Sequence, residues 1–239
     1  MGKTINLTIY KSKHQYLMYS NALSLNNFTK KIKLLILSSF FLTGLFCLGQ
    51  TPYEKGMQKA FDLWKSNDVD AASNLFERIA SVETENWLPE YYIAKINIIK
   101  SFNQTDEKII TAQLAKAQEH LNNANMYSQN NPELIVLQAQ LYTAWVAFDG
   151  QLYGMKYAQK ITQLYNQAYK IEPGNPRVAF GKVEWELGTA KFFNQDTSKF
   201  CEQLNHALKL YDSYEQKGQF HPMGGKNYAS KMTKYHCSN

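Results

Sequence analysis

Apolar side chains along this chain recur at helical spacing from about residue 53 onward. Ala72, Phe76 and Ile79, for example, follow the spacing i, i+4, i+7 that places side chains on one face of a helix. We find no sustained alternation of apolar and polar residues with a period of two, which is the pattern that half-buried strands show. The sequence therefore predicts an all-α protein.

The same pattern predicts four helix pairs followed by a short last helix. Short runs rich in Asn, Asp and Gly separate the apolar stretches, and their side chains suit turns and helix starts. The predicted helices span about 53–65 and 69–82, 89–102 and 107–127, 132–148 and 153–171, 176–193 and 197–214, and finally 226–235.

Proline spacing supports a division into repeating units. Proline is tolerated in the first turn of a helix, and it pushes the preceding residue out of the helical conformation. Five of the six prolines are separated by 37, 43, 44 and 46 residues: Pro52, Pro89, Pro132, Pro176 and Pro222. We expect units over about 52–88, 89–131, 132–175 and 176–221, with a cap over 222–239, because periods of this size indicate helical repeats.

Part of this pattern resembles the tetratricopeptide repeat. The end of the third unit matches the signature of that repeat's second helix, with Tyr165, Ala168, Pro173, Asn175 and Pro176 in place. Ala72, Phe76 and Ile79 form a similar pattern in the first unit, and the layout is similar to that of exported tetratricopeptide proteins of Bacteroidetes-type bacteria. The resemblance implies a TPR-like α-solenoid with a concave groove that binds a protein or peptide.

Charge is unevenly distributed along the chain. Residues 1–49 contain six lysines and no acidic residue, which leaves 20 basic and 20 acidic residues in the rest. The net charge of +6 therefore belongs to the first segment, and the remainder shows no basic excess that would indicate nucleic-acid binding. Residues 50–239 are long enough to form one domain with a substantial core.

The first segment has the form of a secretory signal. Lys30, Lys31 and Lys33 precede an apolar run of 15 residues, Leu34 to Leu48, and small residues precede position 50. We expect residues 1–49 to be a leader cleaved on export to the periplasm or the outside, with Met18 as an alternative start. A retained membrane anchor and a lipid anchor on Cys47 are the alternatives.

Two cysteines, Cys201 and Cys237, remain after the leader. An even number in an exported chain favours a disulfide between them. The alternatives are two free thiols, or a metal site that these cysteines share with His206.

Sequence motifs of catalysis are missing from this chain. We find no HExxH metal motif, no GxSxG nucleophile elbow and no glycine-rich phosphate loop. We therefore expect no enzymatic activity and no cofactor.

The repeat resemblance places the first helix of each pair on the concave surface. This implies six candidate binding residues: Glu90, Asn97, Lys100, Gln140, Arg177 and Glu184. The leading hypothesis is an exported, non-catalytic scaffold for a protein or peptide. A structural subunit of a cell-envelope assembly is the second hypothesis, and a metal-binding or enzymatic protein that uses Cys201, His206 and Cys237 is the third.

Overall fold

The computed structural model describes residues 50–102 and 104–238, and the chain divides into two units, Met1–Thr51 and Pro52–Asn239. The predicted leader over residues 1–49 lies outside the described residues. The described part of the second unit forms nine helices and no strand, which confirms the all-α prediction.

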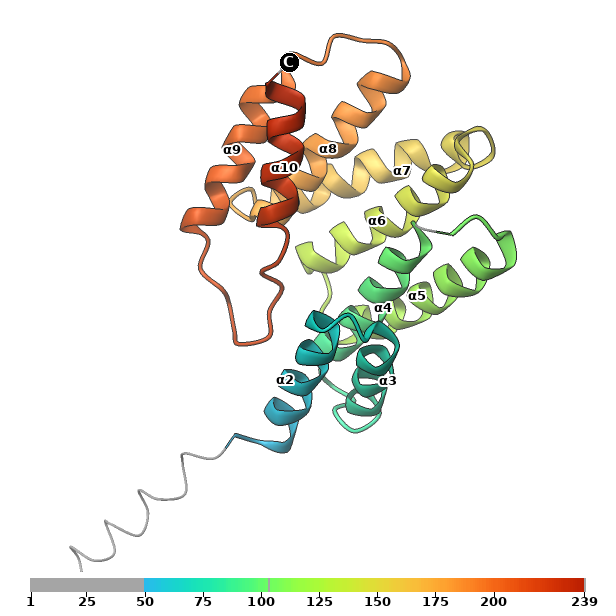
Figure 1. Ribbon diagram of the computed structural model, residues 1–239, viewed down its shortest axis with the longest axis vertical. Coiled ribbons are helices and arrows are strands. Elements are labelled where there is room, and N and C mark those ends of the chain that lie inside the picture. The colour runs from blue at the N-terminus through green and yellow to red at the C-terminus, as the bar shows by residue number, and fades with distance from the viewer. Residues whose placement is uncertain (1–49, 103, 239) are drawn as a thin grey trace, which may run out of the picture. The chain divides into compact units, whose positions relative to one another are not determined.

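The helices alternate with short turns, except before the last one. With the labels of Figure 1 they are Pro52–Lys65 (α2), Val69–Ala80 (α3), Trp87–Ser101 (α4), Glu107–Tyr127 (α5), Pro132–Phe148 (α6), Gly150–Ile171 (α7), Pro176–Phe192 (α8), Phe200–Ser213 (α9) and Lys226–Cys237 (α10).

Asparagine and aspartate side chains begin most of these helices. Each accepts a hydrogen bond from a backbone N–H of the first turn, which satisfies a donor that the helix itself leaves unpaired. The capping residues are Asp68, Asn86, Asp106, Asn131, Asp149 and Asn175. Most turns that the sequence predicted from these residue types therefore mark true helix starts, and the turn before α9 is the exception.

Some predicted boundaries are wrong. Helix α7 begins at Gly150 and not at residue 153, because Asp149 caps it from the preceding turn. Helix α9 begins at Phe200 and not at residue 197, because Asp196 and Ser198 hydrogen-bond to each other in the turn before it. Pro222 lies in an irregular segment before α10, whereas Pro132 and Pro176 are the first residues of their helices.

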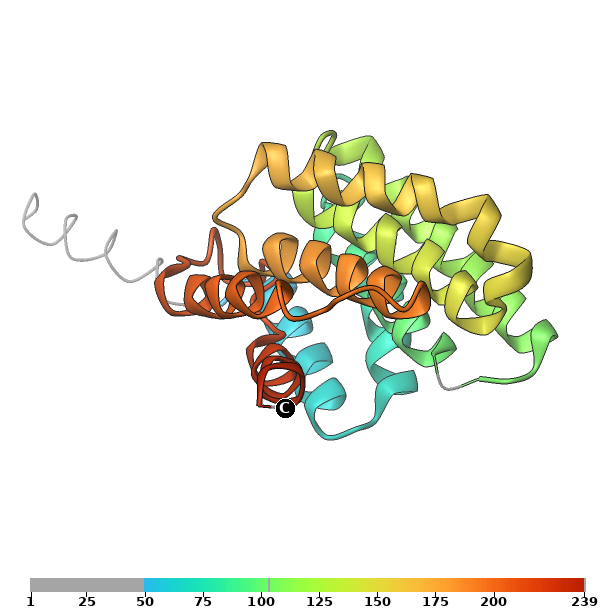
Figure 2. The ribbon, with the colours of Figure 1, turned by 90° about the horizontal axis from the view of Figure 1, so that it is seen from above.

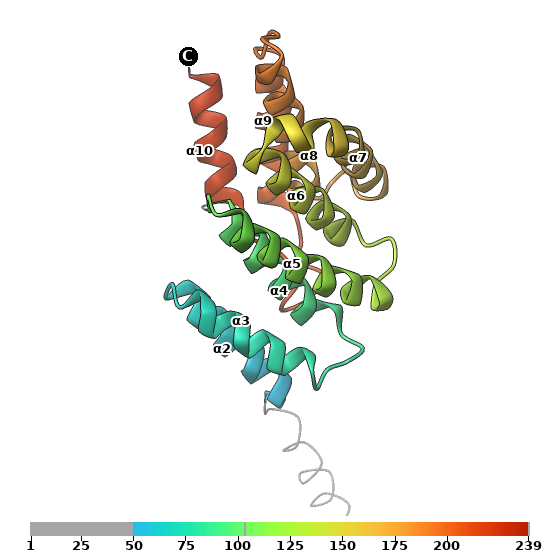
Figure 3. The same ribbon diagram turned by 90° about the vertical axis from the view of Figure 1, so that its right-hand side faces the viewer.

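Helices pack as successive neighbours along the chain. The pairs α2–α3, α4–α5, α6–α7 and α8–α9 each form a contact, and α10 packs on α9. Figure 3 shows the pairs following one another from α2–α3 to α8–α9. The first helices of adjacent pairs also touch, α4 with α6 and α6 with α8. These three helices therefore share one face of the helix stack.

One close helix approach depends on a glycine. A Cβ atom added to Gly181 on α8 would lie 2.8 Å from the ring of Tyr165 on α7. Tyr165 is buried, so its ring has little room to move away. A small residue at position 181 lets α7 and α8 approach each other.

Apolar residues form three buried clusters within the described unit. The largest joins α2 to α6, a second joins α6, α7 and α8, and a third joins α8, α9 and α10. Phe220 is the exception to this order, because it belongs to the largest cluster although it lies between α9 and α10. The chain therefore returns to its first helices after building its last pair.

Candidate functional site

The six candidate binding residues all contact other residues of the same chain. They lie on the first helices of the pairs: Glu90, Asn97 and Lys100 on α4, Gln140 on α6, and Arg177 and Glu184 on α8. The structure distributes them over three helices and does not gather them around one cavity. Their role in binding stays a prediction, and a ligand would have to compete with their internal partners.

The three candidates on α4 illustrate this competition. Glu90 Oε2 lies 2.5 Å from His120 Nδ1 on α5. Asn97 is buried and donates to the backbone oxygen of Ile93 at 2.8 Å. Lys100 Nζ lies 2.6 Å from an Asp70 oxygen on α3. These contacts join α4 to its neighbours or close on α4 itself.

A buried ion pair joins α6 to α8. Arg177 donates through Nε to both Glu133 oxygens, at 2.9 and 3.0 Å, and also through Nη2. Burial disfavours the guanidinium charge, but the hydrogen bonds and charge of Glu133 outweigh it and raise the pKa of Arg177. The α8 cap Asn175, fully buried, donates to the same carboxylate at 2.7 Å. Removing one partner would leave a buried charge without compensation.

Lys95 on α4 is a central cation that the sequence analysis did not single out. Its Nζ donates to Gln140 Oε1 on α6 at 2.7 Å. Burial lowers the pKa of Lys95 to about 8, and the nearby charge of Arg177 acts in the same direction, while Glu133 opposes it. A lysine inside an isoleucine-rich helix was the only local signal in the sequence.

Residues 214–225, which we call the return segment, run from α9 back to the first helices before α10 begins. Figure 1 shows this irregular stretch reaching from the end of α9 toward α2. Phe220 stacks on Phe61 and meets Tyr53 edge-on, with ring centroids 5.9 and 5.7 Å apart. Tyr92 donates its hydroxyl to the Phe220 backbone oxygen at 2.8 Å. The return segment therefore occupies an aromatic site between α2 and α4.

Cys201 and Cys237 lie at disulfide distance, with a Cα–Cα separation of 5.5 Å. This agrees with the predicted pair and links α9 to α10. Within residues 50–102 and 104–238, no group of three His, Cys, Asp or Glu side chains is placed to hold a metal ion. A disulfide would also consume the two thiolates that a metal needs.

Exposed apolar side chains gather at the turns inside the helix pairs. We call this set the apolar edge, and it comprises Ile99, Phe102, Ile109, Leu152, Met155, Phe192 and Phe193. These residues are half of the exposed large apolar side chains in the described part, and the three turns lie on one side of the stack (Figure 1). Met155 is 94% exposed and Phe192 is 73% exposed. The turns that join one pair to the next, at the other ends of these helices, carry fewer such residues, among them Met126 and Ile171.

Beside this edge, aromatic rings form a ladder between α6 and α7. Tyr142 stacks on Tyr157 at 4.6 Å, and Tyr157 lies parallel to Tyr153 at 6.0 Å. The ammonium of Lys156 lies 5.0 Å from the centre of the Tyr157 ring. Partial burial raises the pKa of Tyr142.

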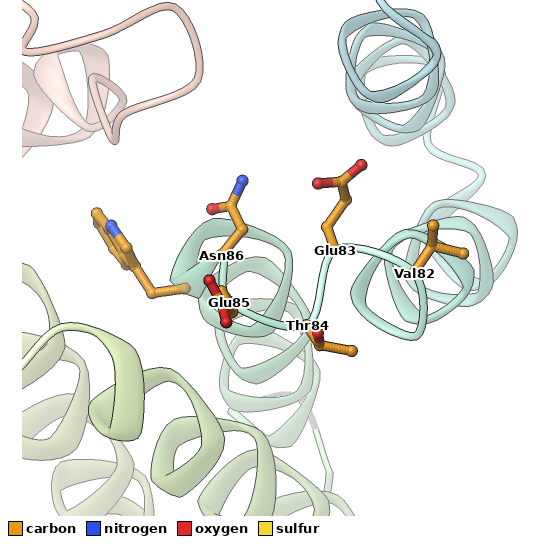
Figure 4. A pocket seen from close by; sticks show the side chains of 6 residues that line it. Val82, Glu83, Thr84, Glu85 and Asn86 are labelled. Atoms are coloured by element: carbon orange, nitrogen blue, oxygen red, sulfur yellow. The ribbon is translucent and has the colours of Figure 1, made fainter.

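One hollow of the described surface is shallow. It has a volume of about 500 Å³, and its six lining residues, 82–87, come from the turn between α3 and α4 and the first residue of α4. Figure 4 shows these side chains spreading from one loop, with Glu83 and Val82 at one end and Asn86 at the other. No second element closes over them, so we assign no binding role to this hollow.

Comparisons with known proteins give one structural likeness. No protein-family model matches the chain, and no curated protein matches it. Among solved structures it is similar to the HusA haemophore from Porphyromonas gingivalis, with 21% identity and a TM-score of 0.68. The likeness covers 80% of this chain and 96% of that one. At this identity it shows a shared all-helical fold.

None of the helices within residues 50–102 and 104–238 combines the length and the apolar character that crossing a membrane requires.

Proposed function

We propose that this chain is an exported, non-catalytic scaffold of the TPR-like solenoid class that binds another protein or a peptide. The observation that carries the proposal is the apolar edge. Each of three successive helix pairs projects large apolar side chains at its inner turn. Contiguous exposed apolar surface is characteristic of interaction sites, and aromatic residues dominate the binding energy of many interfaces.

The six polar candidates already have partners within the chain. We therefore place the proposed contact at the apolar edge and not in the groove. Docking on Phe102, Phe192 and Phe193 leaves the existing ion pairs intact. Docking among Lys100, Arg177 and Glu184 would break contacts such as that between Lys100 and Asp70. A cysteine pair at disulfide distance supports the exported location, because disulfides persist in oxidising compartments.

The test is an affinity capture from envelope extracts with the chain from residue 50 onward as bait. An edge variant carries Leu152→Ser, Phe192→Ser and Phe193→Ser. A control variant carries Met126→Ser and Ile171→Ser at the opposite turns. We expect a partner that the wild type and the control retain and the edge variant loses. A partner retained equally by all three baits would contradict the proposal.

Haem capture is the second candidate, and the structural likeness to a haemophore favours it. Methionine and tyrosine are side chains that ligate haem iron, and the tyrosine ladder lies beside the ammonium of Lys156. Stacking on the ladder and pairing of a haem carboxylate with Lys156 would complete such a site.

Titration with hemin and with iron-free protoporphyrin tests this candidate. We expect both to bind, since stacking needs no iron. We expect Tyr157→Phe, which keeps the ring and removes the hydroxyl ligand, to change the hemin spectrum while leaving protoporphyrin binding intact. An unchanged absorption spectrum of both compounds in the presence of the protein would exclude this candidate.

A further inference from the structure

Helix α10 occupies the position of the first helix of a further pair. Its Tyr228 donates a hydrogen bond to Glu184 on α8 over a separation of 44 residues. The same separation joins Arg177 on α8 to Glu133 on α6. A shift of 44 residues therefore aligns α10 with α8, as it aligns α8 with α6.

In the complete pairs, one face of the first helix packs on the second helix. On α8 this face carries Val183, Leu187 and Ala190, which share a buried apolar cluster with residues of α9. On α6 the positions 44 residues earlier include Ala139 and Val146, which pack in the cluster that contains residues of α7. Apolar side chains at these positions therefore hold each pair together.

On α10 the corresponding face is basic. The positions 44 residues after the three on α8 are Asn227, Lys231 and Lys234, and all three are exposed. We call these residues the basic face. Neither lysine forms an ion pair among residues 50–102 and 104–238, and no helix of that part follows α10. A partner can therefore reach both charges.

The neighbours of the basic face add positive charge and aromatic surface. After Glu215 the chain contains four lysines and no acidic residue, whereas residues 50–215 contain 16 basic and 20 acidic residues. Tyr235 lies one helical turn after Lys231 and is 67% exposed. The ammonium of Lys191 on α8 lies 5.6 Å from the centre of the Tyr235 ring. A partner that matches this surface carries negative charge together with some apolar area.

The place of the basic face in the fold selects an acidic helix as this partner. A helix covers the corresponding face of the first helix in the pairs α6–α7 and α8–α9. The acidic excess of residues 50–215 disfavours a phosphate-covered surface such as a nucleic acid or an anionic membrane. The basic face also carries no large aliphatic side chain that could enter a bilayer. The cysteine pair links α10 to α9, so the face is positioned before a partner arrives.

We propose that the basic face of α10 binds an acidic helix of a partner protein, which packs where the second helix of a further pair would lie. Carboxylates of that helix pair with Lys231 and Lys234, and its apolar side chains contact Tyr235. The proposal rests on the function as a protein-binding scaffold, but it does not require the apolar edge.

The experiment measures binding of an acidic helical peptide to residues 50–239 by fluorescence anisotropy. The probe is a fluorescein-labelled peptide that repeats Glu-Leu-Glu-Ala-Leu-Ala-Ala over about 20 residues, and a matched peptide has Gln in place of each Glu. We expect a dissociation constant on the order of 10–100 μM for the acidic peptide at about 50 mM salt. The matched peptide should bind more weakly by about fivefold or more. Salt at about 500 mM should weaken the acidic peptide, because it screens exposed charges.

Variants assign the contact to α10. Lys231→Gln with Lys234→Gln should weaken the acidic peptide by about fivefold or more, and Tyr235→Ser should weaken it as well. The control, Lys160→Gln with Lys170→Gln, removes the same charge from exposed positions of α7 and should leave the affinity within about twofold. Equal losses in the two double variants, or equal affinity for the two peptides, would overturn the proposal. Tighter binding of duplex DNA or of phosphatidylglycerol vesicles would overturn it too.

The same peptide separates this proposal from the apolar edge. The edge variant should bind the acidic peptide as the wild type does. Peptide binding without any captured partner would reject the apolar edge and retain the basic face. Captured partner without peptide binding would reject the basic face and retain the apolar edge.

Discussion

The two ends of the helical unit are held together by different means. The cluster over α2–α6 contains 23 buried residues among those described, with Phe220 inserted from the return segment. The cluster over α8–α10 contains nine, and four of these are alanines. Alanine buries little area, so the second cluster gains much less from the hydrophobic effect. It is also the cluster in which α9 and α10 are linked through Cys201 and Cys237.

This difference indicates how each end resists opening. At the first end, a distant segment adds aromatic area to an existing core. At the second end, a covalent link compensates for a small core, as small exported domains do. Figure 2 shows the last helix, α10, beside α9 near the C-terminus. We expect the first end to respond to core substitutions and the second end to respond to reducing agents.

Phe220→Ala should have the largest effect. It removes a ring that is 6% exposed and packs on Phe61 and Tyr53. Burial on this scale predicts a loss of about 3–5 kcal/mol in the free energy of unfolding, measured by urea denaturation. Gln219→Ala, at the exposed neighbouring position, should change the stability by less than about 0.5 kcal/mol. Equal losses in both variants would show that the return segment is not docked in solution.

Removing the cysteine pair should have the next largest effect. The link closes a loop of sequence separation 36, and Cys201→Ala with Cys237→Ala should cost about 2–4 kcal/mol. Hydrogen exchange should show faster amide exchange in α10 and α9 than in the parent, with α2–α5 unchanged. An equal loss of protection in α2–α5 would mean that the two ends unfold as one unit. It would contradict the inference that the two ends are stabilised separately.

Lys95→Met, at the first end, should have an effect of the opposite sign: it should stabilise the protein. Burial holds the pKa of Lys95 at about 8, below the value of 10.5 of the unfolded chain, so the unfolded chain binds more protons between these values. The contribution of Lys95 to the stability of the parent should become less unfavourable as pH increases from 8 to 10.5, because its charge is neutralised. Below pH 8 the cost of that charge is fully present.

The variant should therefore be more stable than the parent at pH 7, by roughly 1–3 kcal/mol. The gain should shrink toward zero near pH 10.5, as urea denaturation at both pH values would show. Lys160→Met on the exposed face of α7 serves as the control, with no such gain. A gain of the same size at both pH values would assign the effect to helix propensity or packing, and not to the charge.

Local pattern predicted the helices because helix formation depends on neighbours three and four residues apart. Pro132 and Pro176, which begin α6 and α8, marked helix starts in the sequence for this reason. The pairing of Cys201 with Cys237 followed from an even cysteine count. These features need no knowledge of distant contacts.

The features that could not be predicted from the sequence depend on contacts between residues far apart in the chain. The return segment has no periodic pattern, and Phe220 meets Tyr92 across 128 positions. Arg177 was predicted as a binding residue, but its partner Glu133 lies 44 positions away on another helix. A polar residue on a helix has the same local signature whether it faces solvent, a ligand or a buried carboxylate.

Surface ion pairs should have the smallest effect, and the effect should be equal at the two ends. Lys100 with Asp70 belongs to the first end, and Lys226 with Asp212 belongs to the second. In both pairs the aspartate is mostly exposed, at 80% and 65%, so solvent screens the attraction. Asp70→Asn and Asp212→Asn should each change the stability by less than about 0.5 kcal/mol, and added salt should remove the difference. A clear loss of stability in only one of the two variants would mean that surface charge contributes to the difference between the two ends. Core area and the cysteine link would then not explain that difference alone.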